Sequence, residues 1–385
     1  MSSSTLIAGA GVAGLEGALA FREALGPQSP VTLVGATDTF HYKPLGVGEP
    51  FGLGRPHRHP IAPIAADLGV TFVRDSLQAV DAGAKEVVLA SGERLAYQRL
   101  LVAVGAPTRA PSPFGVLFDR GHDAAVFDEV LADLGAGLIR HVAFAVGAGI
   151  SWPLPAYELA LMTGAWGAAA GTGGVRVSLV SHEPSPLALF GPAASEAVAG
   201  ALERAGVDFY GGVEPVLESD VLIRVGNHML QAERVVVLPE HTGPRLAGLP
   251  ADDHGFVEVD PWGRVPGVPD VYAIGDAAAH RVKHGGLAAQ QAALAVQALA
   301  FDAGLRGRLD DPRPVLRGLL RTIDGPLYLR AVLDDEQATS TTSSEPLWWP
   351  PSKIAAPRLT SYLGRIERAR AEGRVLASGG FAVVG

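Results

Sequence analysis

The sequence predicts an α/β fold in which one strand–turn–helix–strand unit occurs twice. Two glycine-rich turns, at residues 9–14 and 147–149, carry this prediction, because each follows an apolar strand and precedes a helical stretch. The chain is also long enough for two or three hydrophobic cores, with 385 residues of which 48% are hydrophobic. We therefore expect two Rossmann-like units whose parallel strands are largely buried.

The first unit is expected to begin at residue 5. Its predicted elements are a strand at 5–8, an alanine-rich helix that ends near residue 25, and a strand at 31–34. Further strands are predicted at 71–73, 87–89 and 100–105. Residues 106–113 contain three prolines and are predicted to form a linker.

The second unit repeats this order from residue 141. Its predicted elements are a strand at 141–146, a helix through 157–161 and a strand at 175–180. Strands are then predicted at 235–238, 255–259 and 271–276, followed by a helix rich in alanine and glutamine. From about residue 305 the chain combines an arginine-rich helix with a Ser/Thr segment and an aromatic, proline-containing segment. Parts of this region are too apolar for it to be disordered throughout.

Composition excludes several classes of chemistry. The chain has no cysteine, which rules out disulfides, thiolate metal ligands, thiol nucleophiles and redox relays through CxxC motifs. Its net charge of −9 argues against a surface that binds nucleic acid. The N-terminus lacks the features of a secretory signal, and no uninterrupted apolar stretch is long enough to span a membrane. We expect a cytoplasmic protein that acts on small molecules, with contact to a membrane surface and homodimer formation left open.

The first glycine-rich turn has the complete dinucleotide-binding pattern, Gly9-Ala10-Gly11-Val12-Ala13-Gly14. Gly9 allows the tight turn, Gly11 lets a pyrophosphate approach the backbone, and Gly14 lets the helix pack closely on the strand. The helix N-terminus then offers N–H donors to the anion. The carboxylate that usually follows the second strand and binds a ribose is missing, because Gly35 stands there. Asp38 is the nearest acidic replacement.

The second turn departs from this pattern. Trp152 occupies the position of the third glycine, and Pro153 and Pro155 follow it. An indole blocks close approach and proline has no N–H, so we expect weak binding of a second dinucleotide. Pro155 is also well placed in the first turn of a helix. NAD(P)H therefore stays open as a ligand but doubtful, with Glu183 as the remaining candidate for its ribose.

Several segments between Gly9 and about Gln297 resemble one family of flavoproteins. They are the first glycine turn, the loop at 40–45, the strand at 101–106, and the segments 271–276 and 282–288. The chain resembles flavoproteins with two dinucleotide-binding domains, and among them the sulfide:quinone oxidoreductase and type II NADH dehydrogenase branch. This resemblance implies an FAD domain made of residues 1–110 and 252–304. It also implies an inserted NAD(P)-like domain at 111–251 and a C-terminal α/β region, 305–385, that covers the flavin.

The resemblance also implies which residues bind FAD. Asp276 is expected to bind the ribityl hydroxyls, and the backbone N–H groups of Gly286 and Leu287 to face the flavin pyrimidine edge. The remaining residues expected to contact the cofactor are Gly9, Gly11, Val12, Ala13, Gly14, Asp38, Lys43, Pro44, Gly105 and Gly275. A helix N-terminus in this place would stabilise the negative charge of a reduced flavin.

Four basic or imidazole side chains are the candidates for catalysis: Lys43, Lys283, His41 and His284. Only four of the 31 basic residues are lysines, and three of these lie in segments that the resemblance places around the flavin. We therefore expect a compact ammonium group to be needed there, above all that of Lys283. His41 and His284 are candidates for proton transfer, with a purely structural role as the alternative.

Two further groups of residues are candidates for binding sites. Trp348, Trp349 and Lys353 are expected to close a flat pocket for a quinone or an aromatic substrate, with a dimer contact or a membrane-facing patch as alternatives. His57 and His59 lie among arginines with no carboxylate nearby in the sequence, so we expect a solvated loop and no metal site.

Together these features predict an FAD-dependent oxidoreductase. It would pass electrons from a small-molecule donor through the flavin to an acceptor such as a quinone, without a cysteine relay. One alternative is an NAD(P)H:acceptor oxidoreductase that tolerates the altered second turn. The other is a flavin-binding interaction or sensor protein without turnover.

Overall fold

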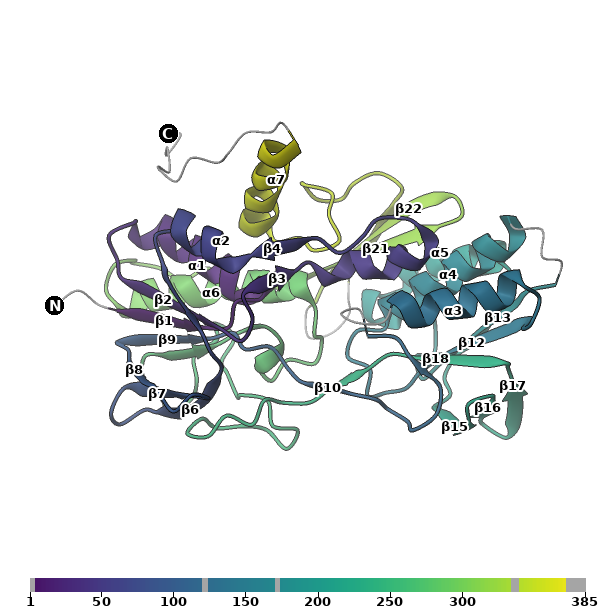
Figure 1. Cartoon of the computed structure of the whole chain (residues 1–385), viewed down its shortest axis with the longest axis horizontal. Helices are drawn as coiled ribbons and strands as arrows, with labels where there is room; N and C mark the ends of the chain where they lie inside the picture. The colour runs from purple at the N-terminus through teal and green to yellow at the C-terminus, as the bar shows by residue number, and fades with distance from the viewer. Residues whose placement is uncertain (1–3, 120–123, 170–173, 334–338, 372–385) are drawn as a thin grey trace.

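Two α/β units lie side by side, and the C-terminal segments cross above both (Figure 1). The structure is a computed structural model, and it describes residues 4–119, 124–169, 174–333 and 339–371. Its mixed α/β architecture, with two parallel sheets of similar construction, confirms the fold class predicted from the sequence. The division into domains at residues 110, 251 and 304 stays a prediction.

The first unit is built on a five-stranded parallel sheet with the order β20-β9-β1-β2-β5. Its strands are β1 (Thr5–Ala8), β2 (Val31–Gly35), β5 (Thr71–Arg74), β9 (Arg99–Val102) and β20 (Val271–Ala273). The helices of this unit are α1 (Val12–Leu25), α2 (Ile61–Asp67) and α6 (Gly285–Asp302), with the 3₁₀ segment η3 (Gly275–Ala277). A second 3₁₀ segment, η1 (Lys43–Phe51), packs on the second unit, where Val47 joins its core. Because β20 joins β9, the chain returns to its first sheet after the second unit.

The second unit has a parallel sheet with the order β11-β18-β12-β13-β14. Its strands are β11 (Val116–Leu117), β12 (His141–Val146), β13 (Arg176–Ser181), β14 (Val207–Tyr210) and β18 (Arg234–Val237). Its helices are α3 (Ala124–Gly135), α4 (Leu154–Ala169) and α5 (Pro192–Arg204), with the 3₁₀ turn η2 (Ala188–Phe190). As predicted, α4 carries Pro155 in its first turn.

Small antiparallel sheets complete the two units. One consists of β6 (Leu77–Asp81), β7 (Glu86–Leu89) and β8 (Arg94–Ala96), and another of β15 (Pro215–Ser219), β16 (Leu222–Val225) and β17 (His228–Gln231). A two-stranded pair joins β3 (Thr39–His41) to β4 (Arg58–Pro60). The predicted linker contributes β10 (Thr108–Arg109), which pairs with β19 (Glu240–His241), so the two passages between the units form one ribbon.

The C-terminal region packs on both units. Its three-stranded antiparallel sheet is formed by β21 (Val315–Thr322), β22 (Gly325–Val332) and β23 (Thr339–Ser343). The last helix is α7 (Pro357–Ala371). Leu316, Leu320 and Leu329 join the core of the second unit, whereas Leu359 and Tyr362 of α7 join that of α1 and α6.

One strand predicted from the sequence is absent. Residues 255–259 form only isolated bridges, through Val257. The reason is a turn at the start of this segment, where Gly255 has a φ of 87° and the Asp252 carboxylate accepts hydrogen bonds from the N–H groups of His254 and Phe256. A turn fixed in this way leaves too short an extended segment for a ladder.

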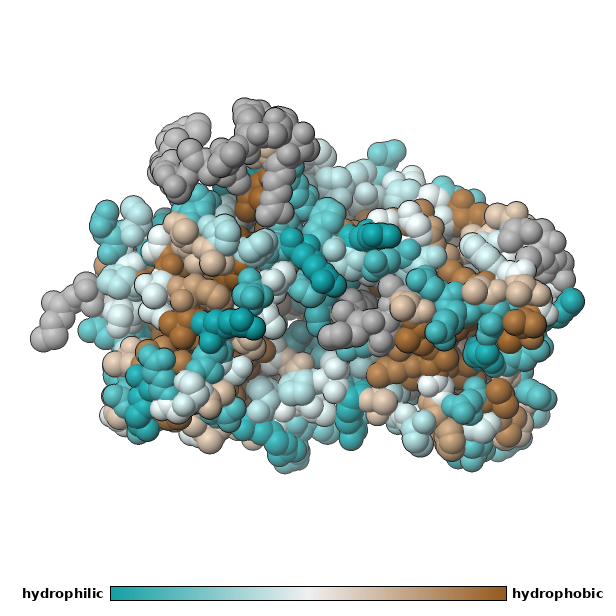
Figure 2. All heavy atoms as spheres, viewed as in Figure 1, coloured by the Kyte–Doolittle hydropathy of each residue, from teal (hydrophilic) through white to brown (hydrophobic). Residues whose placement is uncertain are grey.

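The surface of the second unit exposes several apolar side chains, among them Leu138, Val216, Val221 and Met229. On the face drawn in Figure 2, hydrophobic residues are visible over the half of the molecule that carries this unit. None of the helices in the described ranges is long and apolar enough to cross a lipid bilayer.

Candidate active site

A cavity of about 660 Å³ lies between the two units at the carboxyl ends of the first sheet. Its walls come from the first glycine turn, the 40–44 loop, the segment after β9, the start of α6, the N-terminal part of α4 and the C-terminal region. The size and the switch-point position are typical of a site for a cofactor or substrate in an open α/β sheet.

The first glycine turn forms one end of this cavity. A Cβ atom on Gly9 would lie 2.0 Å from the Ala103 carbonyl oxygen, and one on Gly14 would lie 1.8 Å from the Gly9 carbonyl oxygen, so both positions require glycine. A Cβ atom on Gly11 would meet nothing within 4 Å, because this residue borders the cavity. Among the described residues, no side chain caps the N-terminus of α1. Its N–H donors therefore face open space that suits a pyrophosphate.

The structure does not bring the predicted ribose carboxylate into the cavity. Asp38 is 64% exposed, lies 3.6 Å from Arg74 and does not line the cavity. Asp75, at the end of the neighbouring strand β5, does line it. Its carboxylate accepts hydrogen bonds from the N–H groups of Ser76 and Ser91, and bonding to Ser91 and Ser76 lowers its pKa.

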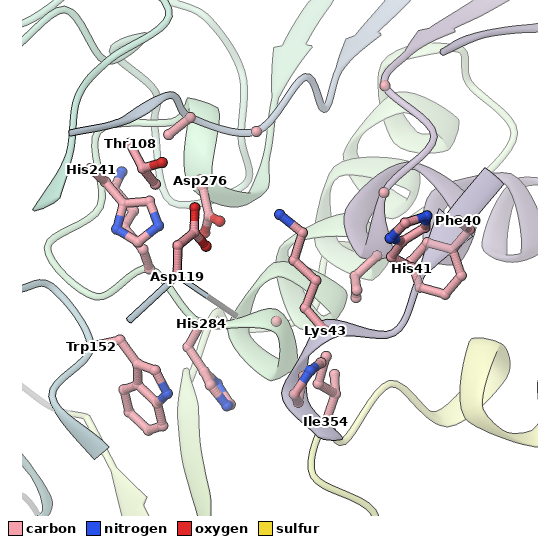
Figure 3. A pocket seen from close by; sticks show the side chains of 18 of the residues that line it. Phe40, His41, Lys43, Thr108, Asp119, Trp152, His241, Asp276, His284 and Ile354 are labelled. Carbon is pink, nitrogen blue, oxygen red and sulfur yellow. The ribbon is translucent and has the colours of Figure 1, made fainter. Parts of the chain in front are cut away.

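The loop after β3 contributes three of the predicted residues, His41, Lys43 and Pro44, to the cavity wall. Lys43 begins η1 and extends its ammonium group into the middle of the cavity, whereas His41 lies beside Phe40 at one side (Figure 3). The two side chains therefore approach a ligand from neighbouring positions on one loop.

Asp276 and Lys283 lie on the opposite wall. Asp276 sits in η3, and its carboxylate points into the cavity (Figure 3). Lys283 is 4% exposed, donates a hydrogen bond to the Ala278 carbonyl oxygen, and has its Nζ 3.6 Å from the centre of the Phe256 ring. Burial lowers the pKa of Lys283 to about 8, although the charges of Asp276 and Asp252 oppose the shift.

The start of α6 borders this wall through Gly285, while Gly286 and Leu287 follow in its first turn as buried residues. In the part of the chain that the structure describes, no side chain caps the N-terminus of this helix. Gly105, which lines the cavity after β9, has a φ of 75°, a conformation that glycine adopts without strain. Gly275 also has a positive φ, and its N–H donates to the Gln291 side chain.

His284 packs against Trp152 at the boundary between the units. The ring centres are 4.4 Å apart, and Trp152 also contacts Phe190 at 6.0 Å. Both His284 and Trp152 line the cavity, where they lie together (Figure 3). The side chain that replaces the third glycine of the second turn therefore forms part of the wall of the first site.

The C-terminal region contributes only part of its predicted pocket. Lys353 lines the cavity, where its ammonium group donates to both carboxylate oxygens of Glu158 and to the Leu319 carbonyl oxygen. Trp348 and Trp349 do not line it. Trp348 packs edge-on against Tyr328, and Trp349 is 82% exposed.

The second glycine turn is filled by acidic side chains of the chain itself. The Ala148 N–H lies 3.1 and 3.0 Å from the two carboxylate oxygens of Glu214. A Cβ atom on Gly147 would lie 2.6 Å from Glu214 Oε1, and one on Gly149 would lie 2.1 Å from Glu240 Oε1. The place where a pyrophosphate would approach this turn thus already holds negative charge.

Glu183, the candidate for binding the ribose of a second dinucleotide, already has a hydrogen-bond partner within the protein. It is 5% exposed, and the Tyr157 hydroxyl donates a 2.8 Å hydrogen bond to its Oε2. Burial raises the pKa of Glu183. A carboxylate buried in this way is directed into the core and away from a ligand.

Sequence reasoning missed several residues that line the cavity, namely Asp119, Glu158 and His241. His241 lies 2.9 Å from the Ser151 hydroxyl. Glu158 had a detectable signal, because it is the only charged residue in the otherwise apolar helix α4. Asp119 and His241 had none, since each stands in a loop or ribbon whose position depends on how the two units meet.

Comparison with known proteins identifies related sequences and folds. A family model described as pyridine nucleotide-disulphide oxidoreductase matches residues 3–296. NADH dehydrogenase-like proteins from two strains of Mycobacterium tuberculosis are 29% identical over 237 residues, which is 58% of this chain and 59% of theirs. The match thus spans less than two thirds of the relatives' length.

Solved structures share the fold at low sequence identity. The sulfide:quinone oxidoreductase of Aquifex aeolicus aligns with a TM-score of 0.77 and 18% identity, over 97% of this chain and 92% of its own. A ferredoxin reductase from Rhodopseudomonas palustris aligns with a TM-score of 0.64 and 22% identity, over 86% of this chain and 82% of its own. NDH2 of Plasmodium falciparum, solved in complex with NADH, aligns with a TM-score of 0.58 and 16% identity, over 72% of this chain and 65% of its own.

Proposed function

The chain belongs to the pyridine nucleotide-disulphide oxidoreductase family, and we propose that it is an FAD-dependent oxidoreductase that passes electrons from a small-molecule donor to an acceptor such as a quinone. One observation carries this proposal: the first glycine turn opens without a side-chain cap into a cavity of about 660 Å³. The same cavity is lined by Asp276, Lys43 and Lys283.

The cavity fits FAD in its chemistry. In our proposal the Gly9–Gly14 turn and the start of α1 hold the pyrophosphate, because glycine is obligatory at Gly9 and Gly14 and the space at Gly11 is open. Asp276 holds the ribityl hydroxyls. The first turn of α6 and Lys283 face the pyrimidine edge, where a positive charge stabilises an anionic ring.

A bound flavin supplies the redox chemistry, and the protein controls access and charge around it. With no cysteine in the chain, the donor must react with the flavin directly rather than through a thiol. His41 and Lys43 on one wall, and His284 on the other, are the groups we propose to hold or move protons during this exchange.

The altered second turn argues against NAD(P)H as the donor. Glu214 and Glu240 place carboxylates against the turn, and Glu183 is buried under Tyr157. A pyrophosphate there would meet the negative charge of Glu214 and the carboxylate of Glu240, which is paired with Arg109, and this weakens its binding. An NAD(P)H:acceptor oxidoreductase therefore stays the second candidate, favoured by the family and by the NADH dehydrogenase-like relatives.

The test is an anaerobic stopped-flow survey of the purified yellow protein, followed by flavin absorbance. We expect FAD to be released on denaturation, slow bleaching by NADH and NADPH, and rapid reoxidation of the dithionite-reduced protein by a water-soluble quinone. Rapid bleaching by either nicotinamide would favour the second candidate. No reoxidation by quinone, dye or oxygen would favour a sensor without turnover.

A further inference from the structure

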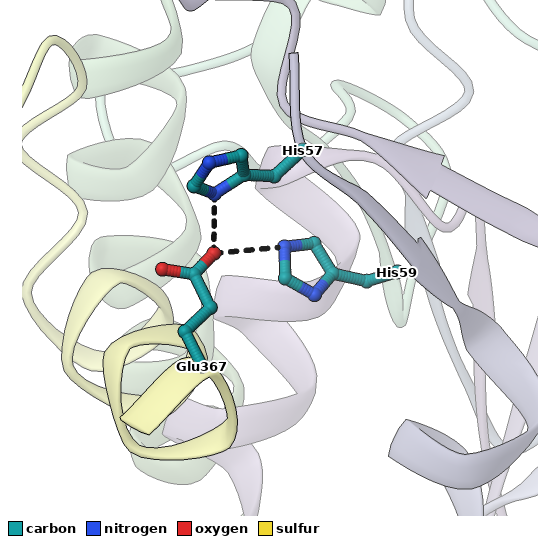
Figure 4. Close-up of side chains that lie close together, drawn as sticks. All are labelled: His57, His59 and Glu367. Carbon is teal, nitrogen blue, oxygen red and sulfur yellow. Dashed lines mark hydrogen bonds and ion pairs between the residues drawn. The ribbon is translucent and has the colours of Figure 1, made fainter. Parts of the chain in front are cut away.

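Three side chains with metal-binding atoms meet outside the cavity. They are His57, just before β4, His59, within β4, and Glu367, from the last helix (Figure 4). His57 Nδ1 lies 2.5 Å from Glu367 Oε1, and His59 Nε2 lies 3.4 Å from the same oxygen. All three ligand atoms lie within 4.8 Å of one another, and none of the three residues lines the active-site cavity.

The segment 57–60, which continues into β4, places both imidazoles on one side. Side chains alternate along an extended chain, so His57 and His59 share a face while Arg58 points away from it. The extended conformation is held by the hydrogen bond from the Tyr42 N–H to the His57 carbonyl and by the pairing of His59 with Phe40 across β3 and β4. His59 is only 2% exposed, so the expected solvated loop is wrong at this residue.

The helix that carries Glu367 is fixed independently of the histidines. Leu359, Tyr362 and Ile366 bury one face of α7 against the first unit. At its N-terminus, the Leu359 N–H donates a 2.8 Å hydrogen bond to Glu16, a buried carboxylate of α1. Glu367 follows Ile366 directly, at the edge of this buried face, and is therefore held over the strand by packing and not only by its contact with His57.

We propose that His57, His59 and Glu367 form a binding site for a divalent transition-metal ion of the zinc type, which fastens α7 to β4. Two imidazole nitrogens and one carboxylate oxygen are ligands that such ions prefer, and tetrahedral coordination at about 2.0–2.1 Å puts ligand atoms roughly 3.4 Å apart. The His59–Glu367 separation of 3.4 Å matches this value, and the His57–Glu367 separation of 2.5 Å is shorter, so a side-chain rotation that moves His57 away from Glu367 makes room for the ion. Water would complete the shell.

The sequence alone argues against this site because it shows no carboxylate near the two histidines. The fold supplies one from a residue 310 positions after His57. Two arginines flank the histidines in the sequence, Arg55 and Arg58, and both are exposed. The site is separate from the proposed function, since it contains none of the residues around the cavity.

The experiment uses the full-length, FAD-loaded protein after treatment with EDTA and gel filtration. Zn²⁺ is titrated in competition with a chromophoric chelator, and Co²⁺ is added separately while the visible ligand-field bands are recorded. We expect one Zn²⁺ per chain, intense Co²⁺ bands of tetrahedral type, and a melting temperature that rises with Zn²⁺. His57→Ala, His59→Gln and Glu367→Gln should each lower Zn²⁺ affinity at least about tenfold.

His228→Ala is the matched control, because His228 is exposed on β17, away from the three ligands. This variant should bind Zn²⁺ as the wild type does. Flavin content and circular dichroism establish that each variant is folded, and Glu367→Gln alters an exposed edge with little risk to the core. Equal Zn²⁺ affinity in Glu367→Gln and wild type, or equal loss in His228→Ala, would overturn the proposal. The proposal would also fail if Glu367→Gln changed the melting temperature by the same amount with and without Zn²⁺. That result would indicate only a hydrogen bond between His57 and Glu367.

Discussion

The two glycine turns of this chain have the same place in the fold and different contents. Both follow the central strand of a parallel sheet, β1 in one unit and β12 in the other. In the first, α1 begins at Val12 directly after Gly11, and the turn faces open space. In the second, α4 begins only at Leu154, and the carboxylates of Glu214 and Glu240 lie against the turn.

The difference shows how a nucleotide-binding turn can be closed without loss of the fold. The backbone N–H of Ala148 is satisfied by Glu214, a residue of the same unit. The displaced helix start brings Trp152 toward His284, where it forms part of the wall of the other site. The carboxylate of Glu214 takes the place that the pyrophosphate of a bound dinucleotide would have at this turn, and the strand order of the sheet is unchanged.

Adding a charge to the open turn should produce the largest effect. Gly11→Asp puts a carboxylate into the space at the N-terminus of α1, in a backbone conformation that any residue adopts. At about 4 Å and intermediate polarity, repulsion of a phosphate is worth about 4 kcal/mol, so FAD affinity should fall on the order of a thousandfold. Fluorescence titration of the apoprotein measures this. Gly11→Asn is the uncharged control of equal size, and an equal loss in both variants would show that space, not charge, decides.

Removing the buried ammonium group should have the next largest effect. Lys283→Met should slow reoxidation and donor-driven reduction about a hundredfold at pH 7, the usual cost of losing one preorganised donor. Because burial lowers the pKa of Lys283 to about 8, its charge is present below pH 8 and is lost above it. The wild-type rate should therefore fall as the pH rises through about 8, whereas the variant rate should stay level. A variant that keeps the wild-type flavin potential and pH profile would exclude this role.

Removing a charge from the closed turn should have a smaller, opposite effect. Glu214→Gln keeps the shape of the side chain and lowers the repulsion of a pyrophosphate, so the rate of flavin reduction by NADH should rise about tenfold. Glu218→Gln, on the neighbouring strand β15 and paired with Arg224, is the matched control and should leave the rate unchanged. If Glu214→Gln did not raise the rate of flavin reduction by NADH, Trp152 and the two prolines would be the features that prevent dinucleotide binding at the second turn.

The smallest effect is expected at the loop after β2. Asp38→Asn should change FAD affinity less than about twofold, because Asp38 is exposed, lies beside Arg74 and does not line the cavity. Asp75→Asn should weaken binding more, since Asp75 borders the cavity and fixes the backbone of Ser76. Equilibrium titration of both apoproteins compares them. A greater loss with Asp38→Asn would restore the sequence-based assignment.

The sequence by itself determined the strand–turn–helix–strand order around each glycine turn and the character of both turns. Glycine at positions 9 and 14 has a cause within the turn, since Gly9 has a φ of 122° and a Cβ atom on Gly14 would meet the Gly9 carbonyl oxygen. The disruption at Trp152 and Pro153 was visible for the same reason. Strand alternation and helix capping are short-range effects, and they are therefore present in the sequence.

Tertiary structure alone decided which distant side chains meet. Glu214 reaches Ala148, Lys353 reaches Glu158, and Glu367 reaches His57, all across long separations in the chain. These contacts depend on how sheets and helices pack, and no local pattern of residues encodes that packing. The sequence thus defined the open first turn, whereas only the fold placed carboxylates in the second and a glutamate beside the two histidines.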